Sequence, residues 1–201
     1  MPIRGVVFDV GNVIVRWDPR TLYSKIFPDA AERDWFLANV CTMPWHMRHD
    51  AGVSFAENRV PLLAAFPEHE AAIVAWEERW WEMFSGPIPE TEAAIEAMAA
   101  RGVPMVGLTN MSSETSEGTF AMSPAFAYLK DVVVSGAVGL MKPDPRIFRL
   151  SAERAGLPPG ELLFVDDSRT NIDAAAACGF DVHLFDNPAA LQPALAARGL
   201  L

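Results

Sequence analysis

Cysteine is scarce in this sequence. Cys41 and Cys178 are the only two among 201 residues, they lie far apart, and no Cys-x-x-Cys pair is present. The sequence therefore indicates neither a disulfide framework nor a thiolate metal site. We expect both cysteines to be buried free thiols.

Positive charge is also low. Lys and Arg together number 16 against 26 Asp and Glu, which gives a formal net charge of -10 and a pI near 4.8. Nucleic-acid backbones and anionic membranes attract clusters of Lys and Arg, so we expect neither as a partner. Small polar molecules remain compatible with this charge.

Long hydrophobic runs are missing as well. The N-terminal apolar run is too short and too interrupted for a signal peptide, and no uninterrupted apolar stretch approaches membrane-spanning length. We therefore expect a cytoplasmic protein. The sequence shows no internal repeat, and its 51% hydrophobic content is sufficient for one core with a sizeable insertion.

What the sequence does contain is an alternation of short apolar runs with helical patterns. The first run, residues 6–8, ends at Asp9 and is followed by the turn signal Gly11-Asn12, so Asp9 is expected at the carboxyl end of a central buried strand. Further strands are predicted at residues 104–110, 132–135, 162–167 and 182–185, with helices at 90–101, 145–155, 171–178 and after residue 188. This alternation predicts an α/β fold, a Rossmann-like parallel sheet with helices on both faces.

The segment between the first two strands is different. Its apolar residues recur at helical spacing and no strand-like run is present. Asp18 and Pro19 are typical of a helix start, and Ser54 begins a capping box with Glu57. Pro61 is expected to kink or interrupt the helix that follows Ser54.

This helical segment is predicted to be a separate unit. Beyond Asp18 it holds five of the six tryptophans, Trp35, Trp45, Trp76, Trp80 and Trp81, most of which we expect to pack between helices. Gly86-Pro87 marks its exit. We therefore predict an α/β core domain at residues 1–15 and 87–201, and an α-helical cap at residues 16–86.

Polar side chains follow the predicted strands at positions that a parallel sheet brings to one edge, where ligands bind. They are Asp9, Thr109, Asn110, Lys142, Asp166 and Asp167. Three carboxylates in one crevice repel each other unless a cation holds them, and oxygen ligands of this kind suit Mg²⁺. The charge of Lys142, the Thr109 hydroxyl and nearby backbone N–H groups would complement a phosphate ester, so we expect a small phosphorylated substrate.

Four segments together resemble the motifs of the haloacid dehalogenase-like hydrolases. They are Asp9-Val10-Gly11-Asn12-Val13, Leu108-Thr109-Asn110, Lys142-Pro143-Asp144-Pro145-Arg146-Ile147-Phe148 and the segment from Phe164 to Ile172. The resemblance covers the whole chain. With a helical insertion after the first motif, the chain is similar to the subgroup with an α-helical C1 cap. That subgroup includes sugar-phosphate phosphatases, such as glucose-1-phosphate phosphatases, and the N-terminal phosphatase domain of soluble epoxide hydrolase.

The resemblance implies catalytic roles for four residues. Asp9 would be the nucleophile that takes the phosphoryl group as an aspartyl phosphate. Thr109 would hold a phosphoryl oxygen, and Lys142 would stabilise charge on Asp9 and on the phosphate. Asn110 would position the phosphate.

The resemblance also implies a metal site. Mg²⁺ would be held by the Asp9 carboxylate, the Gly11 backbone carbonyl and Asp166, with Asp167 as a direct or water-mediated ligand. Asn171 would orient the ligands around the ion.

One position departs from the family pattern. Phosphatases of this group have a general acid two residues after the nucleophile, and here that residue is Gly11. General acid catalysis contributes about 10²–10⁴ in rate, or roughly 3 to 5.5 kcal/mol, so we expect a preference for good leaving groups such as aryl or anomeric sugar phosphates. A cap residue such as His46, His49 or Asp18 is an alternative proton source.

Substrate specificity is expected to come from the cap. Residues 45–50 are candidates to face the site, with Arg48 as a contact for an anionic group or, alternatively, as a solvated surface charge. Neither the substrate nor the oligomeric state is indicated.

Three other functions remain open from the sequence. A catalytically silent binding protein is compatible with the missing acid. A 2-haloacid dehalogenase would use Asp9 but needs no metal, which leaves Asp166 and Asp167 without a task. A phosphoacceptor receiver shares the acids, Thr and Lys, yet its acidic pair comes first in the chain and it has no helical insertion.

Overall fold

A five-stranded parallel sheet forms the centre of the computed structural model, which describes all residues from 1 to 201. Its strand order is β5-β4-β1-β6-β7. The strands are β1 (Gly5–Phe8), β4 (Met105–Thr109), β5 (Asp131–Val134), β6 (Leu162–Asp166) and β7 (Asp181–Leu184). All five predicted strands are present, which confirms the predicted α/β fold.

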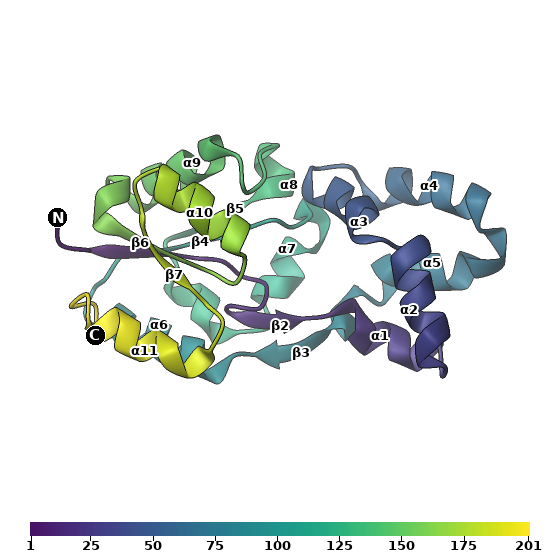
Figure 1. Ribbon diagram of the computed structural model, residues 1–201, viewed down its shortest axis with the longest axis horizontal. Coiled ribbons are helices and arrows are strands. Elements are labelled where there is room, and N and C mark those ends of the chain that lie inside the picture. The colour runs from purple at the N-terminus through teal and green to yellow at the C-terminus, as the bar shows by residue number, and fades with distance from the viewer.

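Helices cover both faces of this sheet. One face carries α6 (Pro89–Ala100) and α11 (Pro188–Ala196), and the other carries α9 (Pro145–Ala155) and α10 (Arg169–Ala177) (Figure 1). The side chains of β1 alternate between the two cores: Val6 and Phe8 pack on the first face and Val7 on the second. Both faces of β1 are therefore buried, which explains its unbroken apolar sequence.

The predicted helical insertion lies beside this core, at the right of Figure 1. It contains α1 (Pro19–Ile26), α2 (Ala30–Asn39), α3 (Met43–Asp50), α4 (Phe55–Ala65) and α5 (Glu70–Glu78), with short 3-10 turns at η1 (Pro67–His69) and η2 (Trp80–Met83). Its side chains form a hydrophobic core of their own. The exact domain boundaries at residues 16 and 86 stay a prediction.

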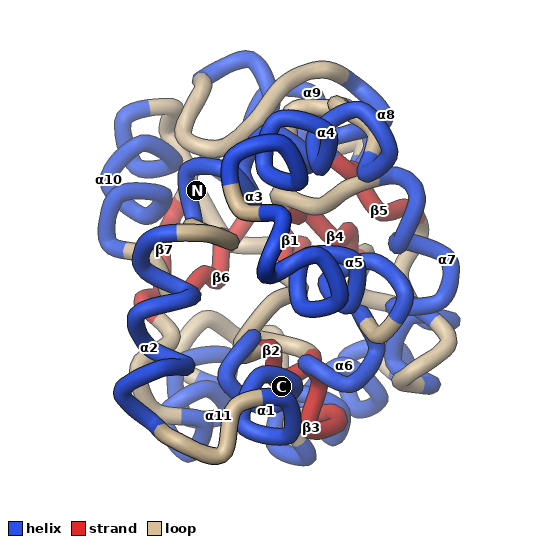
Figure 2. The backbone as a smooth tube through the Cα atoms, turned by 90° about the vertical axis from the view of Figure 1, so that its right-hand side faces the viewer, coloured by secondary structure: helices blue, strands red, loops and turns tan.

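Three of the five cap tryptophans pack inside this second core. Trp45, Trp76 and Trp80 are buried, whereas Trp35 and Trp81 are 47% and 42% exposed. The expectation that most of them pack between helices is confirmed for the first three. In Figure 2 the cap helices lie in front of the sheet.

A two-stranded antiparallel ribbon connects the cap to the core, and the sequence did not predict it. It consists of β2 (Val15–Trp17) and β3 (Phe84–Pro87). The strands have three and four residues, too few for an alternating pattern, and Gly86 and Pro87 favour a turn over a strand. The chain thus enters and leaves the cap through paired strands.

The predicted helix starts are confirmed by their capping geometry. The Asp18 carboxylate accepts a hydrogen bond from the Arg20 N–H, and the Ser54 hydroxyl accepts one from the Glu57 N–H. The expected interruption at Pro61 does not occur, since α4 runs from Phe55 to Ala65. Pro61 and the residue one turn before it, Glu57, are exposed, so solvent can bind the carbonyl that proline leaves unpaired.

The corner between α3 and α4 rests on two short core helices, α7 (Ser113–Phe120) and α8 (Ser135–Val138), that the sequence did not predict. The Ser135 hydroxyl donates a hydrogen bond to the Asp50 carbonyl (2.6 Å) and accepts one from the Met111 N–H (2.9 Å). The Phe55 N–H donates to the Glu114 carboxylate (2.9 Å). The cap is therefore held to the core on the side away from its covalent connections (Figure 1).

Removing the Ser135 hydroxyl is expected to weaken this contact. Ser135→Ala leaves the buried Met111 N–H and the Asp50 carbonyl without that partner, so the free energy of unfolding should fall by about 1–3 kcal/mol. Urea denaturation measures the change. In the control, Ser116→Ala, the lost hydrogen bond is exposed and lies within one helix, and a change below about 0.5 kcal/mol is expected. Equal changes in the two variants would contradict the prediction.

Candidate active site

The carboxyl ends of β1, β4 and β6 bring the predicted polar residues together. Lys142 lies at their centre: its Nζ is 2.8 Å from Asp9 Oδ1 and 2.7 Å from Asp166 Oδ2. Thr109 ends β4, the strand beside β1. Residues separated by more than 150 positions therefore meet, because adjacent parallel strands end at the same edge of the sheet.

Lys142 is held from several sides. It is 3% exposed, and its Nζ also donates to the Leu108 carbonyl (3.2 Å). The Asn110 side chain accepts a hydrogen bond from the Lys142 N–H (2.8 Å) and donates one to the Lys142 carbonyl (3.0 Å). Burial alone would lower the pKa of Lys142, but the charges of Asp9 and Asp166 outweigh it and raise that pKa. Lys142 is therefore a fixed positive charge.

Asp166 is fully buried and its carboxylate is held in place by hydrogen bonds. The Ser168 N–H donates to Oδ1 (2.7 Å), and the Asn171 amide donates to both oxygens at 3.1 Å. Asn171, expected to orient the ligands of a metal, thus contacts one of the candidate ligands directly.

The three acids form a cluster that fits a divalent cation. One carboxylate oxygen from each of Asp9, Asp166 and Asp167 lies within 4.8 Å of the others. Burial raises the pKa of Asp9 to about 8 against the effect of Lys142, and the charges of Asp166 and Asp167 add to the rise. One lysine therefore does not balance three carboxylates. A hard cation such as Mg²⁺ would supply the missing charge, and carboxylate oxygens are its usual ligands.

A cavity of about 360 Å³ lies between this cluster and the cap. From the core it is lined by Gly11, Thr109, Asn110, Met111, Lys142, Pro143, Ser168, Thr170 and Asn171. From the ribbon and cap it is lined by Trp17, Met43, His46, Met47, Asp50, Trp80 and Phe84. A ligand that reaches Thr109 and Lys142 therefore has its other end against the cap.

Helix α3 contributes one face to this cavity. Met43, His46, Met47 and Asp50 follow the spacing i, i+3, i+4, i+7 and all line it. Arg48 lies two residues from His46, about 200° around the helix, and is exposed outside the cavity. Arg48 therefore does not line the cavity, and its position fits the alternative interpretation as a solvated surface charge.

Of the three candidate proton donors named from the sequence, only His46 lines the cavity. His49 is buried, with its ring nitrogens against Asn58 (3.1 Å) and the Val53 carbonyl (3.3 Å), and Asp18 caps α1. Burial and the neighbouring His49 lower the pKa of His46 to about 3. His46 is therefore neutral near pH 7 and has no imidazolium proton to donate to a leaving group.

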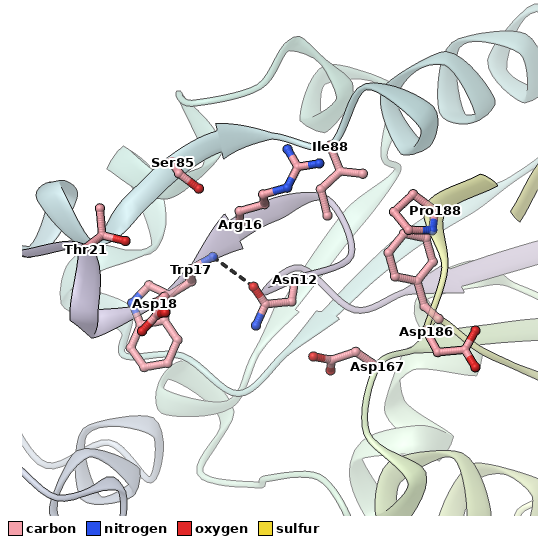
Figure 3. A pocket seen from close by; sticks show the side chains of 11 residues that line it. Asn12, Arg16, Trp17, Asp18, Thr21, Ser85, Ile88, Asp167, Asp186 and Pro188 are labelled. Atoms are coloured by element: carbon pink, nitrogen blue, oxygen red, sulfur yellow. Dashed lines mark hydrogen bonds between the residues drawn. The ribbon is translucent and has the colours of Figure 1, made fainter. Parts of the chain in front are cut away.

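A second cavity, of about 460 Å³, reaches the acidic cluster from the side of β2 and β3. Asn12, with φ of 57°, makes the turn after β1 and accepts a hydrogen bond from the Trp17 N–H (3.0 Å) (Figure 3). The Asp167 carboxylate borders the same cavity (Figure 3). Asp167 is thus the acid of the cluster that solvent reaches.

The chain is also similar in sequence to proteins of a known family. The family described as haloacid dehalogenase-like hydrolase matches residues 3–179. A phosphatase of Mycobacterium tuberculosis is 33% identical over 104 residues, which cover 51% of this chain and 48% of that protein. A phosphoglycolate phosphatase of Escherichia coli O157:H7 is 25% identical over 202 residues, covering 88% of this chain and 79% of that protein.

The match to mouse acyl-CoA dehydrogenase family member 10 is 35% identical over 108 residues but spans only 10% of that protein. Among solved structures, an enzyme from Bacteroides thetaiotaomicron in complex with magnesium and inorganic phosphate shares the fold, with a TM-score of 0.66 and 20% identity. That similarity covers 90% of this chain and 93% of the other.

None of the helices has both the length and the hydrophobicity that a membrane span requires.

Proposed function

Because the chain belongs to the haloacid dehalogenase-like hydrolases, we propose that it is a Mg²⁺-dependent phosphatase that acts through an aspartyl phosphate on Asp9. The observation that carries this proposal is the contact of Lys142 with both Asp9 and Asp166 beside the cavity. The phosphatases among its relatives and the magnesium in an enzyme of the same fold support it.

The proposed reaction has two displacements at phosphorus. In the first, a carboxylate oxygen of Asp9 forms a bond to phosphorus while the bond to the leaving-group oxygen breaks. In the second, water attacks phosphorus and the bond to Asp9 breaks, which releases phosphate and restores the carboxylate. The proton that the water loses passes through solvent to the oxygen anion released in the first step. Lys142 and the Thr109 hydroxyl bind the phosphoryl oxygens, and Asn110 positions Lys142 through its backbone.

Asp9, the Gly11 carbonyl, Asp166 and Asp167 are the proposed ligands of Mg²⁺. When bound, the ion neutralises negative charge on the phosphate and on the carboxylates. Asn171 and the Ser168 N–H hold Asp166 in place, and the buried setting excludes bulk water from Asp9. Since no acid follows Asp9 at position 11, the proposed enzyme favours phosphate esters with good leaving groups, such as aryl phosphates or anomeric sugar phosphates.

Metal removal tests this proposal. The protein should hydrolyse 4-nitrophenyl phosphate in Mg²⁺, lose at least about 100-fold of that rate in EDTA, and regain it when Mg²⁺ is returned, because the ion contributes several kcal/mol to charge stabilisation. Phosphate release measures the rate. Release of halide from a 2-haloacid in EDTA would instead identify a dehalogenase. Absence of turnover in every condition would contradict the phosphatase proposal.

A further inference from the structure

The cap side of the active-site cavity is apolar and holds no cation. Trp17, Trp80 and Phe84 form an aromatic wall, and Met43 and Met47, which are 47% and 46% exposed, lie where the cavity meets solvent. The cavity contains one Lys or Arg, Lys142, and its ammonium group is already paired with two carboxylates. A carboxylate on the leaving group of a substrate would find no positive partner in this wall.

One acid interrupts the apolar wall. The Asp50 side chain lines the cavity and is 7% exposed. Its Oδ1 is buried without a hydrogen-bond partner, and His46 Nε2 lies 3.6 Å from it. The Ser135 hydroxyl fixes the backbone of Asp50 at this position. A buried carboxylate without a partner is costly, and a donor from a bound ligand would remove that cost.

The charges around Asp50 limit what this ligand can carry. Burial raises the pKa of Asp50 to about 7, and Lys142 opposes the rise. Of the other titratable groups nearby, His46 is neutral because burial lowers its pKa to about 3. An added negative charge beside Asp50 would repel it or force it to take up a proton, whereas a hydroxyl would donate to it.

We propose that the substrate has an uncharged leaving group, with an apolar face against the aromatic wall and a hydroxyl that donates a hydrogen bond to Asp50. This inference rests on the proposed phosphatase function and names the class of monoester that the site accepts. It excludes esters such as phosphoglycolate, whose leaving group carries a carboxylate.

Two matched aryl phosphates test the proposal. 4-(Hydroxymethyl)phenyl phosphate and 4-carboxyphenyl phosphate are close in size, and the carboxylate gives the better phenolate leaving group. Chemistry alone thus favours the carboxylate ester. We expect the opposite order, with kcat/KM at least about 10-fold higher for the hydroxymethyl ester, because like charges brought together in an interface cost several kcal/mol.

Charge substitutions in the cap make the test specific. Met47→Lys places a cation on the cavity face of α3 at a part-exposed position, and should reduce or reverse the preference by raising kcat/KM for the carboxylate ester about 10-fold. Asp50→Leu, which removes both acceptor oxygens, should raise KM for the hydroxymethyl ester more than it lowers kcat. The matched control is Val60→Lys, which adds the same charge at a 61% exposed cap residue outside the cavity and should leave the preference unchanged.

The possible results distinguish failure of this inference from failure of the proposed phosphatase function. Equal kcat/KM for the two esters, or a preference that Met47→Lys and Val60→Lys change alike, overturns the inference and leaves the phosphatase proposal standing. Hydrolysis of neither ester in Mg²⁺ overturns both.

Discussion

Gly11→Asp is expected to raise kcat for alkyl phosphates by about 10²–10⁴-fold, because it returns an acid to the position from which the leaving oxygen is protonated. The structure leaves room for the new side chain. Gly11 lines the cavity, its φ is not positive, and a Cβ at this residue would meet nothing within 4 Å. The Gly11 carbonyl, a proposed metal ligand, is unaffected by a change of side chain. Aryl phosphates should gain little, since their leaving groups depart without a proton.

The measurement is kcat across phosphate esters of graded leaving-group pKa. The unchanged protein should show a steep decline as the leaving-group pKa rises, and Gly11→Asp should show a shallow one. Gly11→Asn is the control of equal size that cannot donate a proton from a carboxyl group. If both variants keep the steep decline, or if the unchanged protein already shows a flat profile with chemistry rate-limiting, the role assigned to Gly11 is wrong.

Asp9→Asn is expected to lower kcat for 4-nitrophenyl phosphate by about 10⁴-fold or more, the order of loss that follows removal of a covalent nucleophile. The amide has nearly the shape of the carboxylate but cannot form the phosphoryl ester. Lys142 keeps its contact with Asp166, so the site retains an ion pair and the fold should persist. Circular dichroism and urea denaturation establish that the variant is folded.

Acid quenching during turnover gives a second, independent measurement of the same role. A peptide containing Asp9 should carry the mass of one phosphoryl group in the unchanged protein and lose it in Asp9→Asn. The control Asp173→Asn removes one exposed carboxylate from α10 and should retain both activity and the modified peptide. Phosphoryl transfer to any other residue would assign the nucleophile elsewhere.

The sheet and its catalytic edge were predictable because each depends on short-range pattern. A strand buried on both faces must be apolar throughout, which made residues 6–8 and 162–165 recognisable, and the polar residues that follow such strands are brought together by parallel pairing. Asp9, Lys142 and Asp166 therefore lie together as expected.

The cavity wall was not predictable in the same way, because its composition depends on which face of α3 turns toward the core. The sequence of residues 45–50 offers both Arg48 and Asp50, and only the docking of the helix on Ser135 selects the second. The spacing of Met43, His46, Met47 and Asp50 indicates that these residues share one face of a helix. It does not indicate whether that face is turned toward the core. The ribbon of β2 and β3 depends on pairing between residues 67 to 72 positions apart, which local sequence pattern does not encode.

The way the cap is fastened determines how a ligand can enter and leave. Two strands connect it covalently along one side, and the hydrogen bonds from Ser135 and to Glu114 hold the opposite side. The bond from Ser135 contributes about 0.5–1.5 kcal/mol and the bond to the Glu114 carboxylate about 1.5–3 kcal/mol, so together they contribute about 2–4.5 kcal/mol. A swing of the helices about the ribbon would break these bonds and separate Trp81 from Gly118 of α7, but it would leave every helix and strand intact. A ligand could then enter or leave without any loss of secondary structure.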